Sequence, residues 1–205
     1  MLDRLATTFI APAVQAGAGC LHRMGLRADT ISLAGFATGM MAACLIANGA
    51  HALGLVAILL SRILDALDGA LARLTEPTDA GGFLDITLDF IFYASIPLAF
   101  AINNPPQNAL PAAVLLAAFI GTGSSFLAFA VLAAKQGRQS AAYPNKSFYF
   151  LGGLTEASET LLCFAAMCLW PQLFPEIAYG FAGLCGITII SRVVGGYLAL
   201  KRLAK

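Results

Sequence analysis

The sequence predicts an all-α integral membrane protein with about six transmembrane helices, preceded by an amphipathic helix at the membrane interface. Of its 205 residues, 59% are hydrophobic and only 11% are charged, a far more apolar composition than soluble domains have. The chain also divides into about six apolar stretches, each near the roughly 20 residues needed to cross a bilayer. Lys and Arg fall mostly in alternate connections between these stretches, as in membrane proteins.

We expect residues 1–205 to form one membrane domain, because the chain has no room for a second sizeable core. Residues 1–27 would form the interfacial helix and a linker, and residues 28–205 the six-helix bundle. The first segment is too short and too interrupted by Gly and Pro for a cleavable signal peptide. Its apolar residues, with Arg23 and Arg27 nearby, favour a helix in the interface plane, and the alternative is a frayed leader.

The expected spans end at turn-forming residues. Gly49 follows the first span, Asn103-Asn-Pro-Pro the third, and Trp170-Pro171 the fifth. The six spans lie near residues 30–48, 52–73, 82–102, 109–134, 147–169 and 177–200.

The positive charges predict the orientation. The connections around 49–51, 103–108 and 171–176 hold no Lys or Arg, so by the positive-inside rule they face away from the cytoplasm. Both termini would then be cytoplasmic. The cations assigned to the cytoplasmic side are Arg4, Arg23, Arg27, Arg73, Lys135, Arg138, Lys146, Lys201, Arg202 and Lys205.

Four aspartates lie within otherwise apolar segments, and charge at membrane depth is costly and usually functional. Asp65 and Asp68 are three residues apart, and Asp85 and Asp89 are four apart, so each pair shares one helix face. Four carboxylates would repel one another unless cations bind between them. Oxygen ligands suit Mg²⁺, Mn²⁺ or Ca²⁺, and two such ions commonly clamp a phosphoryl group. The sequence therefore predicts a divalent-metal site near the cytoplasmic side.

Other interpretations of the acidic residues fit the sequence less well. Asp65 could pair with Arg62, and Asp68 with Arg73, in an ion-pair ladder, but two arginines do not account for four carboxylates. A metal-ion transporter would need polar residues across the membrane, whereas these acids cluster at one side. The chain also lacks a convincing internal repeat. A catalytically inactive assembly partner would not need all four aspartates.

The spacing D-x2-D-G-x2-A-R-x7-G-x3-D-x3-D resembles the signature of the CDP-alcohol phosphotransferases, membrane enzymes of phospholipid synthesis. The resemblance implies transfer of a phosphatidyl group from a CDP-alcohol, such as CDP-diacylglycerol, to the hydroxyl of a small polar alcohol, with release of CMP. It also implies two Mg²⁺ or Mn²⁺ ions, membrane-lipid contacts, a homodimer in the bacterial inner membrane and no nucleic-acid partner. The matching positions are Asp65, Asp68, Gly69, Ala72, Arg73, Gly81, Asp85 and Asp89.

The resemblance also assigns roles. Asp65, Asp68 and Asp85 would hold the two metal ions with Asp89, which would also be the general base. Residues expected at the cytidine nucleotide are Asp65, Asp68, Gly69, Ala72, Arg73 and Thr30. Gly69 and Ala72 could equally serve close helix packing. Asp29 is expected to be a helix N-cap, with a nucleotide contact as the alternative.

The acceptor alcohol stays open. A phosphorylated polyol such as glycerol-3-phosphate or inositol phosphate would need cations, and Arg192, within the last span, is the leading candidate. Lys135, Arg138 and Lys146 could contribute, or could simply determine topology. Glu156 and Glu159, three apart in the fifth span, could pair with cations or could bind an amino alcohol, serine or a polyol.

Overall fold

The computed structural model describes residues 2–135 and 154–203, and these form helices connected by short turns, with no strand among them. This confirms the all-α prediction. The elements are α1 (Leu2–Arg23), α2 (Ala28–Ala47), α3 (His51–Leu74), α4 (Asp79–Asn103), α5 (Pro105–Lys135), α6 (Ala157–Leu169), the 3₁₀ helix η1 (Pro171–Leu173) and α7 (Phe174–Leu203).

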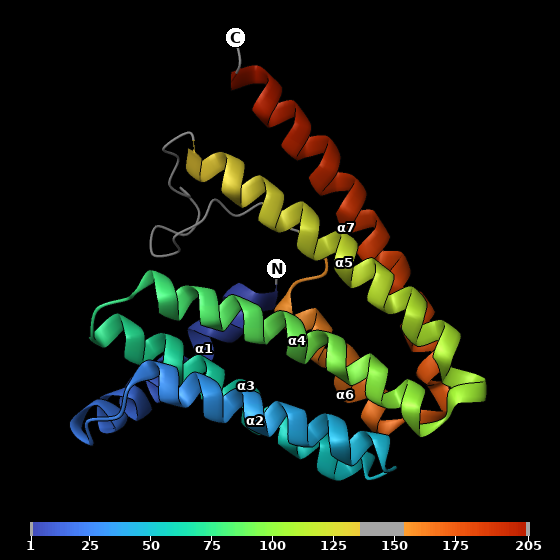
Figure 1. Ribbon diagram of the computed structural model, residues 1–205, viewed down its shortest axis with the longest axis horizontal. Coiled ribbons are helices and arrows are strands. Elements are labelled where there is room, and N and C mark those ends of the chain that lie inside the picture. Colours follow the sequence, from blue (N-terminus) through green and yellow to red (C-terminus); the bar gives the residue numbers. More distant parts are fainter. Residues whose placement is uncertain (1, 136–153, 204–205) are drawn as a thin grey trace.

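The helices are arranged in two groups (Figure 1). In the first group, α2 packs against both α3 and α4, and α1 packs against α3. In the second, α5 and α7 pack along each other, and α5 also contacts α4. Helix α6 contacts α1, α3 and α7 and so joins the two groups. Although only a short turn connects α3 and α4, each of these helices packs mainly on α2 rather than on the other.

Aromatic rings fill the core where the groups meet. Phe92, Phe100, Phe164 and Phe174 are fully buried. The Phe100 and Phe174 rings stack with centroids 4.7 Å apart, and Phe92 and Phe164 meet edge to face at 6.5 Å. These contacts bring α4 against α6 and α7, and they fix the depth of the acidic end of α4.

Helix ends follow local sequence signals. Gly49 adopts φ +81°, and the N–H of Ala50 donates to the Leu45 carbonyl at 2.9 Å, so α2 ends in a left-handed glycine cap. At the start of α4, the Thr78 hydroxyl accepts the Gly81 N–H at 3.0 Å. This cap sets the direction in which α4 leaves the α3–α4 turn.

The predicted N-cap at Asp29 is wrong. Gly25 adopts φ +74°, the chain is extended at Arg27, and Arg27 is the N-cap of α2 without a side-chain cap. Asp29 therefore lies inside the first helical turn, where a carboxylate favours the positive end of the helix dipole.

Within the described residues, four helical segments are long and apolar enough to cross a membrane: Ala28–Ala47, Asp79–Asn103, Pro105–Leu132 and Pro171–Lys201. Helix α3 has the length but also carries Arg62, Asp65 and Asp68, and the apolar helix α6 has only 13 residues. The prediction of six spans is thus not decided for α3 and α6. We treat the chain as an integral membrane protein, as the sequence predicted.

The fifth span was expected to be continuous from residue 147. In the described part of the chain, α6 instead begins at Ala157, and residues 154–156 are not helical. Glu156 is extended and caps the helix: its side chain accepts the Glu159 N–H, while the Glu159 carboxylate accepts the Glu156 N–H at 3.1 Å. This reciprocal capping box fixes the start of α6.

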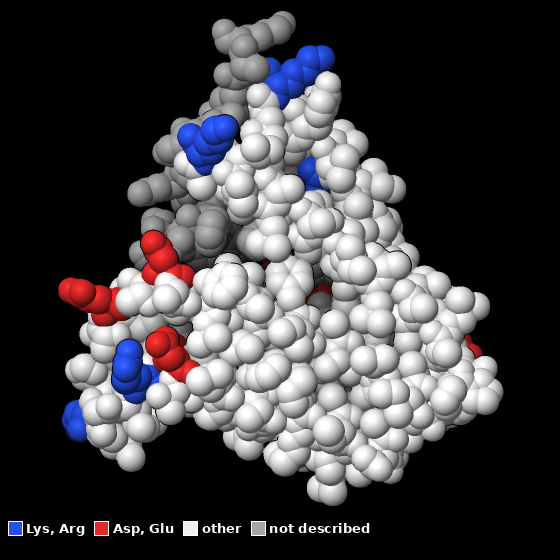
Figure 2. All heavy atoms as spheres, in the orientation of Figure 1, with Lys and Arg blue, Asp and Glu red and all other residues white. Residues whose placement is uncertain are grey.

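Charged side chains gather toward one end of the molecule. Figure 2 shows them around the α3–α4 turn and the final turns of α5 and α7, whereas most of the remaining surface in this view is uncharged. Large apolar side chains are exposed on that remaining surface, as on a lipid-facing surface.

Candidate metal centre

Two helices supply the acidic side chains of the site. Asp65 and Asp68 come from consecutive turns of α3, and Asp85 comes from the second turn of α4. One carboxylate oxygen from each lies within 4.8 Å of the others. Asp68 is buried and Asp85 is exposed, so the cluster is closed on the α3 side and accessible on the α4 side. The convergence expected from the helical spacing is therefore present for these three residues.

The chemistry of this cluster fits a hard divalent cation. The Asp68 Oδ2 atom is buried and has no hydrogen-bond partner among the described residues, an arrangement that is costly unless a ligand compensates it. Its neighbours are carboxylates, which supply the oxygen ligands that Mg²⁺ and Mn²⁺ prefer. Asp65, Asp68 and Asp85 could therefore hold such an ion.

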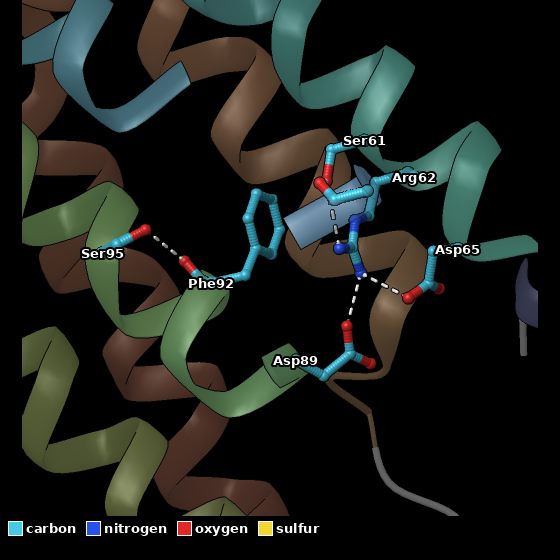
Figure 3. Close-up of polar contacts among 7 residues, drawn as sticks. Ser61, Arg62, Asp65, Asp89, Phe92 and Ser95 are labelled. Atoms are coloured by element: carbon cyan, nitrogen blue, oxygen red, sulfur yellow. Dashed lines mark hydrogen bonds and ion pairs between the residues drawn. The ribbon is translucent and has the colours of Figure 1, made fainter. Parts of the chain in front are cut away.

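Asp89 is held differently from these three aspartates. Its Oδ1 atom accepts a hydrogen bond from Arg62 Nη1 at 2.6 Å, and the same nitrogen lies 3.4 Å from Asp65 Oδ1. In Figure 3, Arg62 lies between the two carboxylates. The Arg62–Asp65 arm of the suggested ion-pair ladder is thus present, and Arg62 also pairs with Asp89, which the ladder did not include.

Helix α2 forms the third wall of the site. Ser32, Gly35 and Phe36 line the same pocket as the four aspartates, Arg62 and Leu88. A Cβ atom at Gly35 would lie only 3.2 Å from Leu64 Cβ, so the absence of a side chain lets α2 approach α3. Sequence reasoning did not find this wall. The glycines at 35 and 39, one turn apart, were the available signal.

The residues expected at the nucleotide lie on α3 and α2 but are not among the residues that line this pocket. Gly69 and Ala72 follow the aspartates on α3, and Arg73 folds back so that its Nη1 lies 3.5 Å from where a Gly69 Cβ would be. Thr30 is exposed in the first turn of α2. Asp29 lies close to Gly81, because a Cβ there would be 3.3 Å from Asp29 Oδ1.

Arg192 is buried between α7 and α5. Its Nη1 donates to the Thr122 carbonyl at 3.2 Å, its guanidinium interacts electrostatically with Glu156, and its Nε has no hydrogen-bond partner among the described residues. Arg192 does not line the acidic pocket described above. It is connected to that pocket by packing, since Gly123, next to Thr122, lies against the ring of Phe90, which follows Asp89.

The remaining acceptor candidates divide into three groups. Lys135 is exposed at the end of α5. Lys146 and Arg138 lie outside the described residues. Glu156 and Glu159 form the capping box of α6 rather than sharing a face within a longer helix.

Comparison with known proteins gives consistent matches. Residues 26–193 match the CDP-alcohol phosphatidyltransferase family. The chain is 52% identical to the inner membrane protein YnjF of Escherichia coli strain K12 over 205 residues, which is 100% of both chains. It is also 44% identical over 68 residues to an archaetidylinositol phosphate synthase of Methanothermobacter thermautotrophicus, covering 33% of this chain and 35% of that protein.

The fold is similar to crystal structures of the phosphatidylinositol phosphate synthase of Mycobacterium tuberculosis. The structure with CDP-DAG bound has a TM-score of 0.71 at 20% identity and covers 90% of this chain and 93% of that chain. The complex with manganese and citrate has a TM-score of 0.69 at 20% identity, covering 90% and 88%. At this identity, the likeness shows the shared fold.

Proposed function

Because this chain belongs to the CDP-alcohol phosphatidyltransferase family, a family of membrane transferases of phospholipid biosynthesis, we propose that it transfers a phosphatidyl group from CDP-diacylglycerol to the hydroxyl of a small polar alcohol and releases CMP. The observation that carries this proposal is the convergence of Asp65, Asp68 and Asp85, with carboxylate oxygens within 4.8 Å of one another. One Asp68 oxygen there is buried and has no hydrogen-bond partner in the part of the chain that the structure describes. A site of this kind suits a pyrophosphate, whose charge requires cations.

The family uses divalent metal ions, and Asp65, Asp68, Asp85 and Asp89 would hold two Mg²⁺ or Mn²⁺ ions in this chain. When bound, these ions would neutralise the pyrophosphate and stabilise the departing phosphate. The chain's own contribution is to bring the four carboxylates from α3 and α4 into one pocket. Gly69, Ala72, Arg73 and Thr30 would receive the cytidine nucleotide.

Asp89 is the proposed general base. Its Oδ1 is hydrogen-bonded to Arg62, which holds the carboxylate in place. The other carboxylate oxygen would take the proton of the acceptor hydroxyl. The acceptor oxygen then forms a bond to the phosphorus that carries the lipid, the bond from that phosphorus to CMP breaks, and CMP leaves with both electrons of that bond.

For the acceptor, we propose a phosphorylated polyol such as glycerol-3-phosphate or inositol phosphate. Arg192 supports an anionic acceptor group, because it is buried and its Nε has no hydrogen-bond partner within residues 2–135 and 154–203. The similarity to an archaetidylinositol phosphate synthase is consistent with it. Lys135 and Lys146 would add positive charge. Glu156 and Glu159 would favour the alternative, an amino alcohol or serine.

We also propose a homodimer whose active site and termini face the cytoplasm.

The test is CMP release by the purified protein with CDP-diacylglycerol and Mg²⁺ or Mn²⁺. The acceptor panel contains glycerol-3-phosphate, inositol phosphate, inositol, glycerol, serine and ethanolamine. We expect release only with one acceptor class. Asp89→Asn should lower the rate by about 10²–10⁴-fold, because it removes the base, while CDP-lipid binding stays measurable.

A matched control comes from the same helix. Asp79 is exposed in the first turn of α4 and does not line the acidic pocket, so Asp79→Asn should keep wild-type turnover. Full turnover in Asp89→Asn would remove Asp89 from the base role. Absence of metal-dependent CDP-lipid binding in the wild-type protein would overturn the proposed function.

A further inference from the structure

Arg62 is a cation inside an acidic pocket. It is the only Lys or Arg among the described residues lining that pocket, and its side chain is only 11% exposed. Its guanidinium bridges α3 and α4, with Nη1 at 2.6 Å from Asp89 Oδ1 and 3.4 Å from Asp65 Oδ1. It therefore already occupies the space between two carboxylates that are proposed to bind metal.

Both terminal nitrogens and one face of the Arg62 guanidinium are held in place, whereas its buried Nε has no hydrogen-bond partner among the described residues. Its Nη2 donates to Ser61 Oγ at 3.3 Å, and Ser61 Oγ in turn donates to the Gly35 carbonyl of α2 at 2.7 Å. The Phe92 ring lies beneath it, 4.0 Å from Cζ to the ring centroid (Figure 3). A planar, permanently charged group held this way is suited to orienting carboxylates. A solvated surface ion pair would not need these supports.

From this geometry we infer that Arg62 is a positioning residue: it orients Asp89 for proton transfer and competes with the divalent cation for the carboxylates of Asp65 and Asp89. This inference rests on the proposed function of Asp89. In the metal-free protein, Arg62 stabilises the carboxylates against mutual repulsion. Arg62 lowers the affinity of these carboxylates for a metal ion, because its positive charge a few ångströms away repels the positive ion.

Replacement of Arg62 should change metal binding and catalysis in opposite directions, which replacement of a purely structural residue would not do. Loss of the Arg62 charge should strengthen metal binding and weaken catalysis at the same time. A residue needed only for folding would, when replaced, weaken both. The side chain is replaced by Gln to remove the charge, and by Lys to keep the charge while removing the planar fork.

The experiment measures Mn²⁺ binding by isothermal titration in the purified protein, alongside CMP release. Arg62→Gln should raise Mn²⁺ affinity at least about tenfold and lower kcat about 10- to 100-fold, with the KM for CDP-diacylglycerol within about threefold. Thermal stabilisation by Mn²⁺ should increase in Arg62→Gln, since tighter binding to the folded state raises its stability. Arg62→Lys should keep Mn²⁺ affinity near wild type and still lower kcat.

Lys201→Gln is the charge control, because Lys201 is exposed near the end of α7 and does not line the pocket; it should leave Mn²⁺ affinity and kcat unchanged. Unchanged or weaker Mn²⁺ binding in a folded Arg62→Gln protein would overturn the inference. If Arg62→Gln does not fold, wild-type kcat in Arg62→Lys would overturn the positioning role. If the wild-type protein binds no Mn²⁺, the proposed function itself is overturned, and with it the inference about Arg62.

Discussion

Arg192 is a buried side chain whose guanidinium still has an N–H group without a hydrogen-bond partner among the described residues. Arg192 Nη1 donates a hydrogen bond to the Thr122 carbonyl, and Arg192 Nε has no partner among the described residues. The centroid of the Phe126 ring lies 5.8 Å from Arg192 Cζ. Leaving a buried guanidinium nitrogen unpaired costs free energy. An anionic acceptor group would offset that cost and explain why the arginine lies in an apolar helix.

Arg192→Ala should therefore weaken one acceptor class selectively. For a phosphorylated acceptor we expect the KM to rise at least about tenfold, the typical effect of a lost charge-assisted hydrogen bond. The KM for CDP-diacylglycerol should change little. The measurement is CMP release at varied acceptor concentration, with Arg192→Lys as the variant that keeps the charge. An unchanged acceptor KM in Arg192→Ala would contradict the assignment.

Gly39 shows how little space lies beneath the acidic pocket. A Cβ atom at this position would be 2.6 Å from the Phe92 ring and 3.1 Å from Ser61 Oγ. Both groups support Arg62. Gly39→Ala should destabilise the fold by about 1–3 kcal/mol through overpacking, and unfolding in detergent would measure it. Gly180→Ala, where a Cβ would meet open space, should be neutral or stabilising by about 0.5–1 kcal/mol.

Helix α6 is short, and its first turn depends on side chains. The Glu156–Glu159 capping box satisfies N–H groups at its start. Just before it, the Thr155 N–H and hydroxyl bond to Thr188 Oγ1 of α7, at 3.2 and 3.0 Å. The carboxylates proposed above as acceptor ligands thus already stabilise the element that connects the two helix groups.

Substitution of Glu159 separates these roles. Glu159→Ala removes one half of the capping box and should cost about 0.5–2 kcal/mol of stability, seen as a lower Tm. Glu159→Gln can still accept the Glu156 N–H, so its Tm should stay near wild type. An acceptor KM that rises in Glu159→Gln at unchanged Tm would instead support direct acceptor binding.

Considered as a whole, the molecule has one charged end and one end poor in charge. The α3–α4 turn, the end of α5 and the end of α7 carry the charged groups (Figure 2), whereas the α2–α3 connection carries no Lys or Arg. We expect the charged end, with the acidic pocket, to face the cytoplasm.

Labelling of single cysteines tests this orientation. In a variant without the five native cysteines, Asn48→Cys marks the α2–α3 connection and Glu76→Cys marks the α3–α4 turn. A membrane-impermeant maleimide should label Asn48→Cys in intact spheroplasts and Glu76→Cys only after permeabilisation. The reverse pattern would place the site on the other side of the membrane.

Much of this architecture could be predicted from the sequence, because apolar length and carboxylate spacing translate directly into helices and faces. The family resemblance is confirmed, and spacings of three and four residues correctly place Asp65 with Asp68, and Asp85 with Asp89, on one helix each. The roles assigned to these residues stay predictions.

What could not be predicted depends on packing between distant segments. Gly35 and Gly39 indicate close packing of α2 on another helix, but their spacing does not identify α3 as that helix. The double pairing of Arg62 likewise requires α3 and α4 to be placed first. The start of α6 was missed because the Glu156–Glu159 pair was interpreted as a helix face rather than as a capping box.

The position of α2 against both α3 and α4 should make the metal affinity of the site depend on bilayer thickness. The carboxylates of α3 and α4 converge because both helices rest on α2, so a change in the tilt of α2 would change the spacing between the proposed metal ligands. Tilt responds to the match between helix length and bilayer thickness. Mn²⁺ affinity should therefore differ between nanodiscs of short and long acyl chains, and an equal affinity would exclude such coupling. An enzyme that makes bilayer lipids would thus have its active-site geometry adjusted by its own product's environment.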